Sequence, residues 1–97
     1  MTTESHIFDQ ISLRIIREQE LVIGPVAWEQ ARKVSGLSII DQRAGTISVS
    51  GNGPVIIDSL VSQYVHLFGN ASKEVCKDAV QDLLADMNPN DVPNSLK

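Results

Sequence analysis

The segment LSIIDQRAGTISVS, residues 37–50, decides the fold of this 97-residue chain. Residues 37–41 and 46–50 are two short runs rich in isoleucine, valine, threonine and serine, and the sequence QRAG at residues 42–45 joins them. Such runs are typical of β-strands, and a short connection that contains glycine is typical of a hairpin turn. In the second run, isoleucine and valine alternate with threonine and serine, which indicates one dry face and one wet face. We therefore predict a two-stranded β-hairpin.

Two helices are predicted before the hairpin. Apolar residues recur at helical spacing from Ser5, which suits the N-cap position, to Ile23. The Gly-Pro pair at residues 24–25 ends this helix and opens a second one, because proline is preferred at the first helical position. We expect the second helix over residues 25–35, with Trp28 on its apolar face.

Two further helices are predicted after the hairpin. The sequence GNG at residues 51–53 breaks the second strand, and residues 54–69 form a helix that proline opens and glycine ends. A fourth helix is expected over about residues 71–87. This order predicts an α+β fold with two N-terminal helices, a central two-stranded β-hairpin and two C-terminal helices. Residues 1–87 form a single compact domain in this interpretation. Residues 88–97, rich in proline and asparagine, form a C-terminal tail that is either loose or a surface strap.

The predicted hairpin needs support from outside itself. A sheet of only two strands is marginally stable in water, and each of its outer edges presents unpaired backbone groups. Edge-to-edge pairing of two hairpins would remove both problems. Our hypothesis is therefore a homodimer in which the two hairpins form a continuous four-stranded sheet.

The composition is that of a globular protein, and it disfavours several kinds of partner. Hydrophobic residues make up 42% of the chain and charged residues 21%, which excludes a disordered tail, a collagen and a disulfide scaffold. The net charge of -4 and the scarcity of aromatic residues disfavour nucleic acids and anionic membranes as partners. The chain has one cysteine, and its first residues lack the basic start of a secretory signal. We expect a cytoplasmic protein.

The loop between the second strand and the third helix has some features of a ligand site. Gly51, Asn52 and Gly53 allow close approach of the backbone, and the helix N-terminus that follows favours an anion such as phosphate. The loop lacks the lysine and the serine or threonine of a phosphate-binding P-loop, and Pro54 removes one N–H donor. The alternative is a plain turn, which Asn-Gly sequences favour.

No catalytic residue, metal site or cofactor is predicted. Cys76 lies on the apolar face of the fourth helix, where a buried thiol has a raised pKa and is a poor nucleophile. Lys73 and Lys77 would lower that pKa if the thiol were exposed, so a thiol-based enzyme is a minor alternative. Cys76, His6 and His66 do not have the spacing of metal ligands.

A row of aspartates is a candidate partner-binding surface. Asp78, Asp82 and Asp86 are four residues apart and line one edge of the fourth helix, where like charges repel one another. They form either a solvated face or a docking ridge for a basic partner. The matching charge could come, within a homodimer, from basic residues of the first two helices, namely Arg14, Arg17, Arg32 and Lys33.

Trp28 and Arg32 complete the set of candidate residues. Small neighbours beside Trp28 indicate that the indole lies in the core or at a subunit interface, and Arg32, one turn on, could lie over its ring. The sequence favours a small non-enzymatic cytosolic interaction or regulatory module that acts as a homodimer or as an accessory subunit. The alternatives are an anion-sensing domain that uses the loop at residues 50–54 and a thiol-based enzyme.

Overall fold

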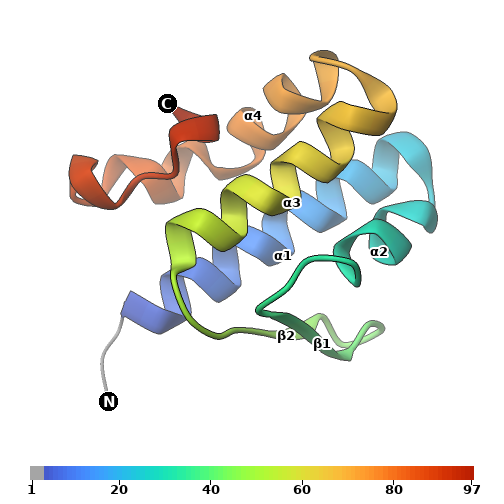
Figure 1. Ribbon diagram of the computed structural model, residues 1–97, viewed down its shortest axis with the longest axis horizontal. Coiled ribbons are helices and arrows are strands. Elements are labelled where there is room, and N and C mark those ends of the chain that lie inside the picture. The colour runs from blue at the N-terminus through green and yellow to red at the C-terminus, as the bar shows by residue number, and fades with distance from the viewer. Residues whose placement is uncertain (1–3) are drawn as a thin grey trace.

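The computed structural model describes residues 4–97. In chain order its elements are α1 (Glu4–Ile23), α2 (Val26–Ala31), β1 (Leu37–Asp41), β2 (Thr46–Val49), α3 (Gly53–Phe68), α4 (Ala71–Ala85) and the 3-10 turns η1 (Pro89–Asp91) and η2 (Asn94–Leu96). This order confirms the predicted α+β fold. Along the chain, two helices precede the two-stranded antiparallel sheet and two helices follow it. Figure 1 shows α1 and α3 running in the same direction, with α4 returning in the opposite one.

The ends of α1 follow from its sequence only in part. The helix begins at Glu4, so Ser5 lies inside it and the prediction of Ser5 as the N-cap is wrong. Its end at Ile23 agrees with the prediction, because Gly24 adopts a φ of 77° and donates its N–H to the carbonyl of Glu20 at 2.8 Å. Glycine reaches this left-handed conformation without strain. The fully buried apolar side chains of α1 are those of Ile11, Ile15 and Ile16.

The second helix is shorter than the predicted span of residues 25–35, because it ends at Ala31. Beyond this residue the chain continues in tighter turns, in which the N–H groups of Lys33 and Val34 donate to carbonyls three residues back at 3.1 Å. These turns bury the side chain of Val34. Gly36, with a φ of 87°, then directs the chain into β1.

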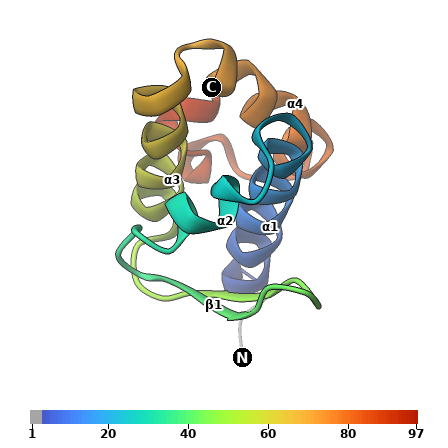
Figure 2. The same ribbon diagram turned by 90° about the vertical axis from the view of Figure 1, so that its right-hand side faces the viewer.

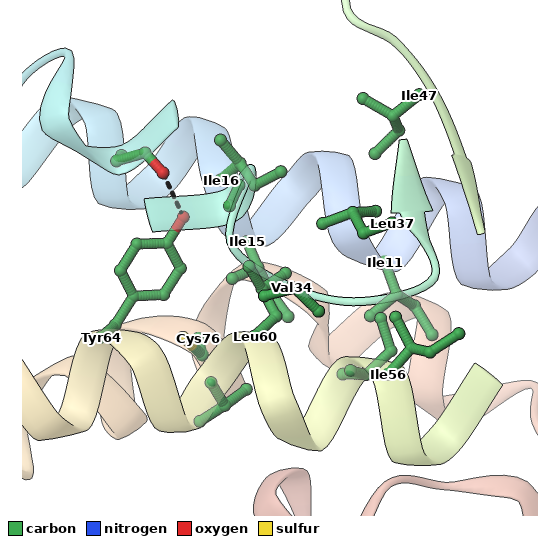
Figure 3. Packing of buried hydrophobic residues seen from close by; sticks show 14 of the residues in the cluster. Ile11, Ile15, Ile16, Val34, Leu37, Ile47, Ile56, Leu60, Tyr64 and Cys76 are labelled. Carbon is green, nitrogen blue, oxygen red and sulfur yellow. Dashed lines mark hydrogen bonds between the residues drawn. The ribbon is translucent and has the colours of Figure 1, made fainter. Parts of the chain in front are cut away.

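α3 contributes more buried apolar side chains than any other helix. The side chain of Asn52 caps its start, and Gly69, with a φ of 85°, ends it. The hydroxyl of Tyr64 donates to the carbonyl of Ala27 at 2.7 Å and ties α3 to α2, as Figure 3 shows. In that view the buried side chains of α3 meet those of α1 and the hairpin. The buried apolar face of α3 consists of Ile56, Ile57, Leu60, Val61 and Tyr64.

Residues 88–97 pack against the helices instead of extending into solvent. Pro93 and Leu96 are buried. Ser95 donates both its N–H and its hydroxyl to Oδ1 of Asp58 on α3, at 3.0 and 2.6 Å. The last segment of the chain therefore covers part of α3 and forms one body with the helices.

Candidate functional site

The two outer edges of the hairpin differ, because α1 lies beside the edge of β2 and binds it at Val49. The N–H of Ser50 donates to the carbonyl of Gly36 at 2.8 Å, which sets the pattern of hydrogen bonding between the strands. Because backbone N–H groups alternate between the partner strand and the outer edge, the N–H of Val49 points away from β1. The carboxylate of Asp9 on α1 accepts this N–H at 2.8 Å. One of the two edges that we expected to be unpaired is therefore covered by α1.

The outer edge of β1 is open. Ile39 faces Ile47 at a position where the two strands exchange no hydrogen bonds, so the N–H and C=O of Ile39 point away from β2. Among the described backbone groups and the side chains of residues 7–97, none donates to or accepts from these two groups. In Figure 2 the hairpin crosses the lower end of the molecule, and Ser38, Ile40 and Asp41 of β1 are exposed. The backbone of Ile39 thus lacks a partner among the residues that the structure describes.

Ile40 makes this edge apolar as well as unpaired. The register shifts between Ile39 and Asp41, which places Ile40 in a β-bulge. Its side chain is 67% exposed. No lysine or arginine lies within β1, although such residues commonly protect a free edge from pairing. The other large apolar side chains that are exposed are those of Leu21, Val22, Val55, Leu67 and Phe68.

The loop at residues 51–53 uses its own polar groups to begin α3. The side-chain oxygen of Asn52 accepts the N–H of Val55 at 3.1 Å, and the carbonyl of Asn52 accepts the N–H of Ile56 at 3.0 Å. Pro54 has no N–H to offer. Donors that an anion would need at this helix N-terminus are therefore already engaged within the chain.

The glycines of this loop have structural roles. Gly53 is buried beneath the ring of Phe8, and a β-carbon at this position would collide with that ring. Gly51 has a φ of 109°, which favours glycine at the bend. A cleft of about 440 Å³ lies beside the loop, but two aspartates and one lysine line it. This geometry gives the predicted anion site no support.

Asp78, Asp82 and Asp86 of α4 differ in their contacts, because only Asp82 forms an ion pair among the described residues. Nη1 of Arg14 on α1 donates to Oδ1 of Asp82 at 2.8 Å and to the carbonyl of Ala79 at 3.3 Å. The hydrogen bond from Arg14 holds the pKa of Asp82 below its usual value. Asp78 and Asp86 are exposed and form no ion pair with residues 4–97. At Asp82, the basic partner that we expected in a second subunit belongs to the same chain.

Cys76 is fully buried between α1 and α4. The amide of Gln19 donates to its Sγ at 3.3 Å and to the carbonyl of Ser72 at 3.0 Å. Burial raises the pKa of the Cys76 thiol to about 11, although the hydrogen bond from Gln19 opposes part of the shift. A neutral thiol enclosed in this way is a structural group, and the geometry does not favour a nucleophile.

Trp28 and Arg32 lie near each other but make different contacts. Trp28 is part of the core, with 2% of its surface exposed, and its indole N–H has no acceptor within residues 4–97. Nη2 of Arg32 donates to Oε1 of Gln42 at 2.7 Å. Arg32 therefore connects the end of α2 to the turn of the hairpin.

No protein-family model, curated protein or solved structure matches this chain. Within residues 4–97, histidine, cysteine and acidic side chains nowhere gather in a group of three that could hold a metal ion. Each helix in the same range is too short or too polar to cross a membrane. Of the surfaces described above, the outer edge of β1 is the one where backbone groups and an apolar side chain both lack cover.

Proposed function

We propose that this protein is a non-enzymatic protein–protein interaction module that acts as a homodimer joined through the outer edges of its β1 strands. The observation that carries the proposal is the difference between the two edges of the hairpin. Asp9 binds the edge of β2 and Ile47 is buried there, whereas on the edge of β1 Ile40 is exposed and the N–H and C=O of Ile39 have no partner among the described residues. A free edge pairs readily with another strand, and pairing would convert two marginal hairpins into a four-stranded sheet.

The sequence of β1 suits pairing with a second copy of itself. A two-fold axis at Ile39 places its N–H opposite the C=O of the same residue in the second copy, so two hydrogen bonds form by symmetry. Asp41 is the only charged residue of β1 and does not lie opposite its own copy in this register, so no like charges oppose each other. The bulge at Ile40 ends the regular ladder, which limits pairing to a short and defined segment.

The dimer would display the exposed aspartates of α4 twice. Asp78 and Asp86 are the candidate contacts for a basic protein partner, and such charges act mainly on association rate and specificity. If the protein is instead an accessory subunit, the same β1 edge receives a strand from a different protein. The two arrangements differ in the mass of the purified chain, which is that of a dimer only in the first.

Replacement of Ile40 by lysine tests the proposal. A lysine at this position would place a charge on the pairing edge and oppose association. The matched control is Val55→Lys, which introduces the same charge at another exposed apolar side chain, on α3. We expect sedimentation velocity to show dimers for the wild type and for Val55→Lys, and monomers for Ile40→Lys. A wild-type protein that stays monomeric at the highest concentration, or an Ile40→Lys variant that dimerises normally, would contradict the proposal.

A further inference from the structure

A cleft of about 510 Å³ lies between α1, α2 and the turn that joins the two strands of the hairpin. Figure 1 shows the tip of the hairpin on the same side of the molecule as α2. Three distant parts of the chain therefore contribute to this cleft. The residues that line it are Arg17, Glu20, Trp28, Gln42 and Arg43.

Two arginines line the cleft from different elements, and neither has an ion-pair partner among the described residues. Arg17 belongs to α1 and Arg43 to the hairpin turn. Neither forms an ion pair with residues 4–97, although Glu20 lines the same cleft. The guanidinium of Arg17 lies against Gly45, where a β-carbon would collide with its Nη2. Because Gly45 has no side chain, the guanidinium of Arg17 can occupy the space beside the turn.

Trp28 forms part of the wall of the cleft and is itself buried. Trp28 is 2% exposed, and its Nε1 has no hydrogen-bond partner within the described part of the chain. A buried N–H without an acceptor is unfavourable, and such groups are rare in native proteins. Next to it, the hydrogen bond from Arg32 holds the side chain of Gln42 in place at 2.7 Å. The cleft therefore combines the guanidinium groups of Arg17 and Arg43 with a Gln42 side chain that Arg32 holds in place.

We propose that this cleft binds a small hydroxylated oxyanion, either a phosphate ester or a carboxylate, between the guanidinium groups of Arg17 and Arg43. Guanidinium groups hold such oxyanions through pairs of N–H···O hydrogen bonds. The carboxylate of Glu20, which lines the same cleft, accepts from a hydroxyl group of the same ligand. This binding is independent of the pairing of β1.

The only tryptophan of the chain lies in the wall of the cleft, so its fluorescence reports occupancy directly. The probes are glycerol 3-phosphate and glycerate, which share hydroxyl groups and differ in the oxyanion, with inorganic phosphate as a third. Sodium chloride at matched ionic strength controls for screening. We expect a saturable change in emission and a rise in melting temperature with at least one of the two hydroxylated probes. Comparison of the two probes identifies the phosphate or the carboxylate as the preferred group.

Variants of the two arginines separate a built site from a general salt effect. Arg17→Gln and Arg43→Gln should each weaken binding by roughly tenfold or more, whereas Lys97→Gln, which removes the same charge outside the cleft, should leave it unchanged. Circular dichroism checks that each variant is folded, and Arg43 lies exposed in a turn where its loss does not disturb the core. A response that never saturates, that chloride reproduces, or that both arginine variants retain at full affinity would overturn the proposal.

Discussion

Single polar side chains join segments of this chain that are far apart in sequence. Gln19 on α1 reaches α4, Asp9 on the same helix reaches β2, and Asp58 on α3 reaches the C-terminal segment. Sequence reasoning did not find these contacts. Gln19 stands between two glutamates, so its position looks solvent-facing until the packing of α1 against α4 is known. The partner of a polar side chain depends on tertiary structure, whereas its helical position depends on local sequence.

Among the candidate residues too, local sequence predicts burial but does not predict which side chains meet. Trp28 and Cys76 lie on apolar faces of helices, and periodicity alone was enough to indicate that they are buried. The sequence places Arg17 only among the basic residues that could match the aspartates of α4, and it does not show that α1 and the hairpin turn line one cleft with Arg17 and Arg43. Burial can be read from spacing, but the convergence of charged groups requires the fold.

The thiol of Cys76 should make stability depend on pH in the alkaline range. Burial raises its pKa from 9.0 to about 11, so the folded protein holds this proton more tightly than the unfolded chain does. The contribution is fully present below pH 9.0 and is lost as the pH rises toward the folded-state value. We expect the free energy of unfolding, measured by urea denaturation, to fall by about 2–3 kcal/mol over this range.

The control for this prediction is Cys76→Ser, which keeps a small polar group beside Gln19 but does not ionise. Burial also raises the pKa of Tyr64, so some loss of stability above pH 10.0 remains in the variant. Between these two pH values, 9.0 and 10.0, the variant curve should be flatter than that of the wild type. Parallel curves for the two proteins would show that the thiol is not buried as described.

At the scale of elements, local sequence accounts for the hairpin and for most helix ends. The Gly-Pro pair after α1 and the glycine after α3 end those helices as predicted, since both glycines take positive φ angles. The early end of α2 was not predictable, because it depends on the burial of Val34 beside the hairpin. The inequality of the two hairpin edges was also missed, since it arises from the contact of Asp9 with β2. The end of α2 and the difference between the hairpin edges thus depend on tertiary contacts, which local sequence patterns do not reveal.

Gly53→Ala tests how α1 meets the start of α3. The added methyl group would collide with the ring of Phe8, because Gly53 is buried directly beneath it. Overpacking of this kind costs about 1–3 kcal/mol, and we expect a loss of that size in the free energy of unfolding.

A double-mutant cycle with Phe8→Ala provides the control. Removal of the ring leaves space for the methyl group, so Gly53→Ala should cost much less in the Phe8→Ala background than in the wild type. Equal costs in the two backgrounds would mean that Gly53 and Phe8 are not in contact.

At the scale of the whole molecule, the fold buries most but not all of the large apolar side chains. Short chains bury a smaller fraction of their surface than long ones, and here several large apolar side chains remain exposed. α1 and α3 end at the same end of the molecule in Figures 1 and 2, and Leu21, Val22, Leu67 and Phe68 lie near those ends. Ile40 lies instead on the hairpin, beside the free backbone of Ile39. The proposed dimer covers this second region.

Hydrogen exchange at the amide of Ile39, followed by NMR at increasing protein concentration, tests the proposed pairing most directly. The amide of Val49 is the internal reference, because Asp9 accepts it within one chain and its protection should not depend on concentration. We predict that the Ile39 amide exchanges rapidly in dilute protein and becomes protected as dimers form. An Ile39 amide that exchanges at the same rapid rate at every concentration would contradict the pairing of β1 with a second copy.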